Sequence, residues 1–381
     1  MNKVSGQWLT NPATQDVASM FIDTGYQVFF VGGCVRNALL NVSVSDIDMA
    51  TDALPETVLQ LGKDAGFKTI PTGIDHGTVT VVSGGIAHEI TTFRTDVATN
   101  GRHADVAFSN DITQDARRRD FTMNALYADP NGTVHDPVCG LPDLQARKVK
   151  FVGEPHERIA EDYLRILRFF RFHAWYGDAN AGLDVESLAA CADGIEGLKQ
   201  LSRERVGAEM IKLLSADNPA PSIASMSHTG VLQSVMPGAD PKALAPLIHF
   251  EDERAPDWRR RAAVLSGKDL KDEWRLSKKD VLHLNQLRQA LVDLTAIPEL
   301  SYRYGATMAL NTALARSALF ETPLAHTVKT EIELAANATF PIKAADLPKL
   351  EGRDLGEKLR ALESVWIQSG FTISKADLLA L

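Results

Sequence analysis

The chain has 381 residues, 45% of them hydrophobic, and a formal net charge of −9. This length exceeds one ordinary core and predicts two or three domains. The acidic balance argues against loose, charge-driven coating of nucleic acid. Three widely spaced cysteines, no signal-peptide pattern and no apolar run near the ~18 residues of a membrane span predict a cytoplasmic protein without membrane association.

The first part of the chain alternates between helix and strand patterns, with an antiparallel or mixed sheet expected. The polar stretch 95–110 is predicted to be a mobile loop. β-Branched runs separated by Ser83-Gly-Gly85 indicate a hairpin. We expect helices over 14–23, 35–40, 55–65 and 112–119, and strands over 28–30, 46–48, 67–71, 77–82 and 88–93.

The strand signal fades after Pro142, and the rest of the chain has helical periodicity. The strongest amphipathic pattern covers 157–175, and further helices are expected over 185–198, 203–214 and 223–235. The sequence therefore predicts an α/β head followed by a long helical remainder.

A glycine turn and two carboxylates lie close together in the head. Gly32 and Gly33 link a strand to a helix, where a backbone without Cβ atoms and the free N–H groups of the helix start suit a phosphate. If 46–48 is a strand, Asp46 and Asp48 share one face. Like charges repel unless a cation lies between them, and hard oxygen ligands suit Mg²⁺ that also holds substrate phosphates. Glu89, on a neighbouring strand, is either a third metal ligand or an exposed strand residue.

Arginines gather on one face of the predicted helix 157–175. At ~100° per residue, Glu161, Arg165 and Arg168 fall within an arc of about 60°, which Asp162 and Arg171 flank. A solvated, salt-bridged helix face would look the same, but arginine without lysine favours recognition of phosphate or planar groups. The run Arg117-Arg-Arg-Asp120 is a surface patch by itself and a phosphate or ribose clamp if it lies beside the glycine turn.

Together and in this order, these segments resemble one family, the class II tRNA nucleotidyltransferases, which comprises CCA-adding enzymes and the related bacterial poly(A) polymerases. The resemblance runs nearly end to end and is densest before residue 214. It rests on Val31-Gly-Gly-Cys-Val-Arg36 with Asp46-Ile-Asp48, Arg118-Arg-Asp-Phe-Thr-Met-Asn-Ala-Leu126, Asp136-Pro-Val-Cys-Gly-Leu-Pro-Asp-Leu144, Glu161-Asp-Tyr-Leu-Arg165 and Leu201-Ser-Arg-Glu-Arg205.

The resemblance implies a polymerase β-like nucleotidyltransferase head with a mixed sheet, followed by an all-helical neck, body and tail. The catalytic head would cover 1–140, a nucleotide-selecting neck 141–215, and a tRNA-binding body and tail 216–381. It implies template-independent addition of C, C and A from CTP and ATP to the tRNA 3′ end with release of pyrophosphate. No obligate protein partner is expected.

The resemblance also assigns roles to single residues. Metal binding and catalysis would belong to Asp46 and Asp48, with Mg²⁺ as the cofactor. The other roles concern the nucleotide. Gly33 and Arg36 would bind the triphosphate, while Arg119 would contact the nucleotide and Asp120 its ribose. Asp162 and Arg165 would read the base, with Glu161 orienting the arginine, and phosphate or base contacts would come from Arg168 and Arg171.

Two positions depart from the family: Asn37 stands where aspartate is usual, and Tyr163 where proline is common. Poly(A) polymerase, which adds an A tail, is the alternative activity, although Thr72-Gly-Ile-Asp-His-Gly-Thr-Val-Thr80 resembles the CCA-adding version of that region. Addition of CC alone is disfavoured because the stretch after Arg94 has full length. A non-catalytic RNA-binding protein on the same fold is a second alternative, against which both aspartates argue.

Overall fold

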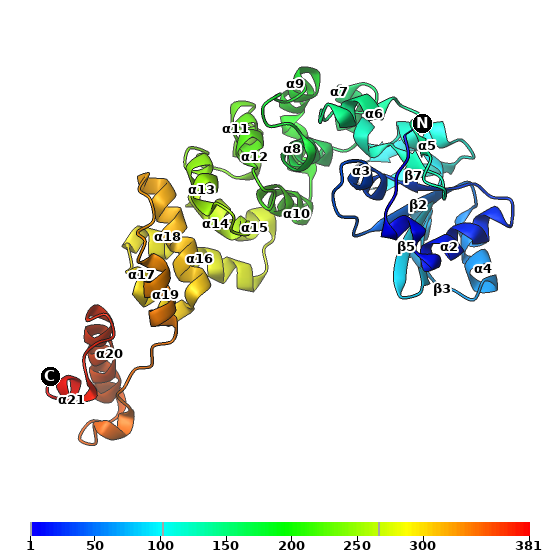
Figure 1. Cartoon of the computed structure of the whole chain (residues 1–381). Coiled ribbons are helices and arrows are strands. Elements are labelled where there is room, and N and C mark those ends of the chain that lie inside the picture. The colour runs from blue at the N-terminus through cyan, green and yellow to red at the C-terminus, as the bar shows by residue number, and fades with distance from the viewer. Residues whose placement is uncertain (1, 101–102, 266) are drawn as a thin grey trace. The chain divides into compact units, whose positions relative to one another are not determined.

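The computed structural model describes residues 2–100, 103–265 and 267–381 (Figure 1). Over 96–106 it describes the backbone alone, apart from residues 101–102. Its chain forms two compact units. The first contains Met1–Glu209 with His228–Ser234, and the second contains Met210–Ser227 with Val235–Leu381. The finer division into head, neck, and body with tail stays a prediction.

The first unit is built on a seven-stranded mixed sheet in the order β3-β4-β5-β2-β1-β8-β9. Strands β2 and β5 run parallel, and the other neighbours run antiparallel. The predicted α/β head with a mixed sheet is confirmed. The strands are β1 (Val28–Val31), β2 (Ile47–Thr51), β3 (Lys68–Gly73), β4 (Thr78–Ser83), β5 (Ile86–Thr92), β8 (Tyr127–Ala128) and β9 (Val134–His135).

Helices cover this sheet where the sequence predicts them. Helix α2 (Pro12–Ile22) begins with Asn11, whose side chain accepts the Ala13 N–H, and buries Val17 and Phe21. It packs with α4 (Pro55–Asp64) against β4. Helix α3 (Gly33–Leu39) contacts β1 and β2, and the short α1 (Gln7–Thr10) and α5 (Ile112–Arg117) complete the head.

The prediction of a loop over 95–110 was wrong. Strands β6 (Arg94–Asn100) and β7 (His103–Phe108) pair antiparallel in a second, two-stranded sheet. Polar and apolar residues alternate only over His103-Ala-Asp-Val106, and Val97 stands next to Ala98. The stretch therefore lacks a sustained strand period, and its polar composition suggested a loop. Residues 101–102, which the predicted loop included, lie outside the described residues.

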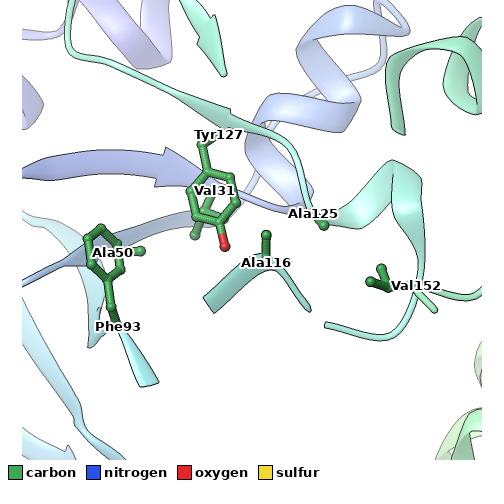
Figure 2. Close-up of a cluster of buried hydrophobic side chains, with 7 residues drawn as sticks. All are labelled: Val31, Ala50, Phe93, Ala116, Ala125, Tyr127 and Val152. Carbon is green, nitrogen blue, oxygen red and sulfur yellow. The ribbon is translucent and has the colours of Figure 1, made fainter. Parts of the chain in front are cut away.

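A cluster of buried side chains ties the sheet to the segment that carries the arginine triplet (Figure 2). Tyr127 from β8 lies against Ala116 from α5, and both are fully buried. Burial of these apolar groups fixes α5, and the arginines that follow it, beside the ends of β1 and β2. The members are Val31, Ala50, Phe93, Ala116, Ala125, Tyr127 and Val152.

The helix predicted over 157–175 is interrupted. Helix α7 (Pro155–Glu161) ends before Asp162, whose backbone is extended at φ −153° and ψ 105°, and α8 (Leu164–Tyr176) begins two residues later. The Asp162 carboxylate accepts the Leu164 N–H at 3.1 Å, so a local side-chain bond replaces a helical one. The remaining helices of this part are α6 (Gly140–Gln145), α9 (Val185–Asp193) and α10 (Arg203–Leu214).

From Met210 on, the regular elements among the described residues are helices, which loops and turns connect. Three buried charges join its helices: Arg260 Nε and Arg261 Nη2 donate to Glu251 at 2.8 and 2.6 Å. A separate core around Trp366 holds the C-terminal segment together. The chain continues through α11 (Ala220–His228), α12 (Val231–Val235), α13 (Leu244–Glu251), α14 (Trp258–Leu265), α15 (Lys271–Trp274), α16 (Lys278–Asp293), α17 (Ile297–Tyr304), α18 (Ala306–Phe320), α19 (Val328–Ala336), α20 (Gly352–Gln368) and α21 (Lys375–Leu379). Among the described helices, none combines the length and apolar character that crossing a bilayer requires.

Candidate active site

Two carboxylates lie side by side on neighbouring strands. Asp48 in β2 is the register partner of Glu89 in β5, and partners in a parallel pair face the same side of the sheet. Burial, followed by the charge of Glu89, raises the pKa of Asp48 to about 6, while the Arg119 guanidinium acts to lower it. A carboxylate held in this way is stabilised by an added cation, and its oxygens are the hard ligands that a divalent ion prefers.

Asp46 lies one residue before β2 and is exposed, with its carboxylate accepting the Ser45 hydroxyl at 3.0 Å. Ile47 between the two aspartates is buried, as the two-residue period predicts. The described residues contain no group of three or more His, Cys, Asp or Glu side chains placed to hold a metal ion. The oxygens of Asp46 and Asp48 are of the kind that suits a metal which also holds substrate phosphates, and the ligand roles of Asp46, Asp48 and Glu89 stay predictions.

The glycine turn lies directly beside these strands. Gly32 has φ 70°, a conformation that favours glycine, and precedes α3. A Cβ atom on Gly32 would stand 3.3 Å from Arg119 Nη1 and 3.5 Å from Asn124 Oδ1, so the missing side chain also lets these groups approach. Gly33 is the first residue of the helix and is half-buried. Triphosphate binding by Gly33 stays a prediction.

Arg36 is buried against α8. Its guanidinium donates to Asn124 Oδ1 and to the Tyr176 hydroxyl, both at 2.8 Å, and lies 3.9 Å from the centre of the Tyr176 ring. It also donates to Asn37. Burial lowers the pKa of Arg36. The predicted triphosphate contact would require the side chain to exchange some of these bonds.

Asp115 holds the two arginines that follow α5. Its buried carboxylate accepts Arg118 Nε at 2.7 Å, Arg119 Nη2 at 3.2 Å and the Tyr127 hydroxyl at 2.6 Å. Burial opposes ionisation, but Arg119 and Arg118 outweigh it and lower the pKa of Asp115 to about 2. Sequence reasoning missed this residue, although its spacing of three and four from the arginines is the helical ion-pair signal.

The carboxylates and arginines line a common cavity of about 390 Å³. Asp48 and Glu89 form its acidic part and Arg94, Arg118 and Arg119 its basic part. The pairing suits a substrate that carries phosphates and a cation. Thr72 from β3 and His76 from the turn after it also line the cavity, and sequence reasoning had noted the region 72–80 without assigning a site role.

The Asp120 carboxylate accepts four hydrogen bonds. One oxygen accepts the Phe121 N–H at 2.9 Å and Asn124 Nδ2 at 3.1 Å, and the other accepts Nε and Nη2 of Arg168, the former at 2.7 Å. Burial opposes ionisation, but Arg168 holds the pKa of Asp120 well below its usual range. A carboxylate has about four acceptor sites, so Asp120 fastens α8 to the head, and its predicted ribose contact would displace one of these donors.

A second cavity, of about 310 Å³, lies beside α8 and is lined by Arg118, Arg119, Asp162, Arg165 and Arg205 among others. Arg165 donates to Glu161, as predicted, and also to the Arg158 carbonyl at 2.7 Å. Asp162 has a different partner, because Arg205 Nη2 from α10 donates to it at 2.6 Å. Arg118 and Arg119 line both cavities, so the cavity of the carboxylate pair and the cavity of Asp162 and Arg165 have two guanidinium groups in common.

Helix α10 supplies partners to the arginine face of α8. Glu209, one turn after Arg205, is buried and accepts Arg171 Nε at 2.5 Å, and Arg168 Nη1 lies 4.0 Å away. The Arg171 guanidinium is therefore paired with Glu209, and its predicted contact with phosphate or base stays a prediction. Sequence reasoning quoted Arg205 as part of a motif but did not identify it or Glu209 as a partner, because the pairs span 38 to 43 positions.

The chain was compared with known proteins. Residues 28–150 match the family described as "Poly A polymerase head domain", and 182–242 match "Probable RNA and SrmB- binding site of polymerase A". The human protein named CCA tRNA nucleotidyltransferase 1, mitochondrial, is 30% identical over 398 residues, which cover 98% of this chain and 90% of the relative. The chain belongs to the CCA-adding family of tRNA nucleotidyltransferases.

Other members of the CCA-adding family agree with this assignment. A CCA-adding enzyme of Geobacillus kaustophilus is 33% identical over 351 residues, covering 85% of each chain. The crystal structure of the Bacillus stearothermophilus CCA-adding enzyme in complex with CTP has a TM-score of 0.78 at 28% identity, covering 94% of each chain. The family predicted from the motifs is confirmed, and nucleotidyltransferases of this kind generally use a divalent metal.

Tyr163, one of the two departures from the CCA-adding family, has a local explanation. A Cβ atom on Gly197 would stand 2.0 Å from Tyr163 Cδ1, so the tyrosine ring lies directly against the glycine. Its backbone, at φ −60°, is one that proline would also adopt. The aromatic ring thus fills space beside Gly197 without altering the chain path between Asp162 and Leu164.

Proposed function

We propose that the chain adds C, C and A, from CTP and ATP, to the 3′ end of tRNA and releases pyrophosphate. The observation that supports this most strongly is that Arg118 and Arg119 line both cavities. One cavity offers carboxylates for phosphoryl chemistry, and the other offers a carboxylate and a guanidinium suited to a base edge. The family assignment agrees with the same activity.

On the head side, Asp46 and Asp48 would hold Mg²⁺. When bound, the metal lowers the pKa of the attacking 3′-hydroxyl and stabilises charge on the triphosphate. Asp48 is fixed by the sheet, and Arg119 is fixed by Asp115 and by the Tyr127 hydroxyl at 3.0 Å. We assign Arg119 to a contact with the incoming nucleotide, and Gly33 and Arg36 to the triphosphate. The glycine turn lets the triphosphate approach the protein backbone.

On the neck side, Asp162 and Arg165 would read the base. C and A both present an amino donor next to a ring-nitrogen acceptor, which matches a carboxylate acceptor beside a guanidinium donor. Glu161 orients Arg165, and Arg205 leaves Asp162 with lone pairs still available to a base. The protein side chains then take the part that a template strand takes in other polymerases.

The tRNA would lie on the helical region 216–381, which we assign to recognition by shape and phosphate contact. No obligate protein partner is required by this scheme. The division into catalytic head 1–140, nucleotide-selecting neck 141–215 and tRNA-binding body and tail, like the cytoplasmic location, stays a prediction.

The test is the length of the product. The protein is incubated with Mg²⁺, labelled CTP and ATP, and tRNA that lacks its 3′ CCA, and the products are separated at single-nucleotide resolution. A fixed extension of three nucleotides supports the proposal. A long A tail supports poly(A) polymerase, a two-nucleotide product supports CC addition, and an unchanged tRNA supports a binding protein.

An Asp48→Asn variant separates chemistry from binding in this assay. The amide keeps the shape of the side chain but removes the charge that would hold the metal. We expect the fixed extension to disappear while the folded state and tRNA binding are retained. Normal incorporation by a folded Asp48→Asn protein would remove the metal assignment.

A further inference from the structure

Asn37 joins two parts of the candidate active site through its side-chain amide. It lies in α3, directly after Arg36, and is half-buried. Its Oδ1 accepts Nη2 and Nε of Arg36 at 2.9 and 3.2 Å. Its Nδ2 donates to the Ser43 carbonyl at 3.0 Å. The segment 41–46, which ends at Asp46, is therefore fastened to α3 by a side chain as well as by the Val42 N–H bond to the Asn37 carbonyl at 2.8 Å.

The two sets of bonds define the orientation of the amide. A guanidinium has donors only and a carbonyl oxygen accepts only, so Oδ1 must face Arg36 and Nδ2 must face Ser43. An aspartate could replace the first function but not the second. It would place a charged acceptor against the Ser43 carbonyl, with no donor between them.

The neighbourhood of Arg36 shows what the neutral side chain leaves in place. The Arg36 guanidinium donates to Asn37, Asn124 and the Tyr176 hydroxyl, which are all uncharged. Asn37 therefore adds no negative charge to these contacts. Compared with a carboxylate, the amide adds one hydrogen bond, which its Nδ2 donates to the Ser43 carbonyl.

We propose that Asn37 is a positioning residue for Asp46. Through the Ser43 bond it fixes the segment 41–46, and so it sets where the exposed Asp46 carboxylate stands relative to Asp48. This inference rests on the proposed function, in which both aspartates hold the metal. It assigns the Asn37 amide to metal geometry and turnover rather than to nucleotide selection.

The test compares Asn37→Asp and Asn37→Ala, which both lose the donor to Ser43, although only the aspartate adds a charge. Asn41→Asp is the matched control, because it adds the same charge four residues later, in the exposed segment that Asn37 fastens, at a left-handed position that aspartate tolerates. For each protein, kcat and KM for CTP are measured with tRNA, the affinity for Mn²⁺ is measured by calorimetry without nucleotide, and unfolding is followed in urea.

We expect both Asn37 variants to show about fivefold lower kcat and about fivefold weaker Mn²⁺ binding, the effect of one hydrogen bond. Their KM for CTP should change less than kcat, and the Asn41→Asp control should match the wild type. Asn37→Asp should lose no more resistance to urea than Asn37→Ala, since its carboxylate still accepts Arg36. Wild-type kcat and Mn²⁺ affinity in Asn37→Ala would overturn the inference, as would an effect confined to Asn37→Asp.

The Asp48→Asn variant separates a failure of this inference from a failure of the proposed function. If Asp48→Asn is inactive while the Asn37 variants behave like the wild type, the proposed function stands and the inference fails. If Asp48→Asn is active, both fail.

Discussion

Asp115 offers a direct measure of how strongly the arginine pair is held. The substitution Asp115→Asn keeps the size of this fully buried side chain and removes its charge. In the folded protein the pKa of Asp115 is lowered from 3.8 to about 2. At ~1.4 kcal/mol per pKa unit, ionised Asp115 contributes about 2–3 kcal/mol to the free energy of unfolding at neutral pH.

The pH dependence follows from the direction of the shift. Because the folded pKa is depressed, the stabilisation is present above the unfolded pKa near 4 and is lost as the pH falls towards 2. The difference in unfolding free energy between wild type and Asp115→Asn should be about 2 kcal/mol at pH 7 and about half of that at pH 3. Urea unfolding followed by circular dichroism at pH 7, 5 and 3 measures this difference, provided the m-values agree.

The control is Asp64→Asn, an exposed carboxylate at the end of α4 in the same unit. Its difference from the wild type should stay within about 0.5 kcal/mol at each pH. A difference for Asp115→Asn that is the same at pH 7 and pH 3 would refute the reasoning, and so would one below about 1 kcal/mol at pH 7. Because Asp115 also aligns Arg118 and Arg119, the folded variant should have a raised KM for CTP.

Three further changes test other parts of the structure. Arg165→Ala should relax discrimination of CTP and ATP against GTP and UTP by about tenfold in competition assays, with tRNA affinity nearly unchanged. Arg205→Gln removes a partly exposed charged bond to Asp162 worth about 1 kcal/mol, so kcat/KM for CTP should fall by about fivefold while the exposed-site control Lys199→Gln is unaffected. Glu251→Leu leaves two arginines buried without their carboxylate and should lower the unfolding free energy of the second unit by about 3–5 kcal/mol in urea.

Local patterns in the sequence predicted much of the head. The glycine pair, the two-residue period at Asp46-Ile47-Asp48 and the proline at the start of α4 each act over a few residues, and the structure places β1, α3, β2 and α4 at those positions. The resemblance to a family then linked these elements to the arginine helix. Short-range signals of this kind depend on the backbone and on nearest neighbours, which the sequence states directly.

The rest depended on contacts that periodicity does not encode. A continuous 3.6-residue pattern concealed the break at Asp162, because the side-chain bond that ends α7 leaves the spacing of apolar residues intact. Hydrophilic composition concealed the hairpin of β6 and β7. The partners of Asp162 and Arg171, namely Arg205 and Glu209, come from a helix about forty positions away, and only the packing of α8 against α10 brings them together.

Strand β2 lies inside the sheet, bonded to β1 on one edge and to β5 on the other. Displacing Asp48 by the length of a nucleotide would break ladders on both edges at once. Under the proposed function, in which Asp48 holds the metal, three successive additions at one site would therefore require the growing end of the tRNA to move while the carboxylate keeps its position. The sheet would then be the fixed part of the reaction, and the movement between additions would belong to the RNA and to the residues that bind it.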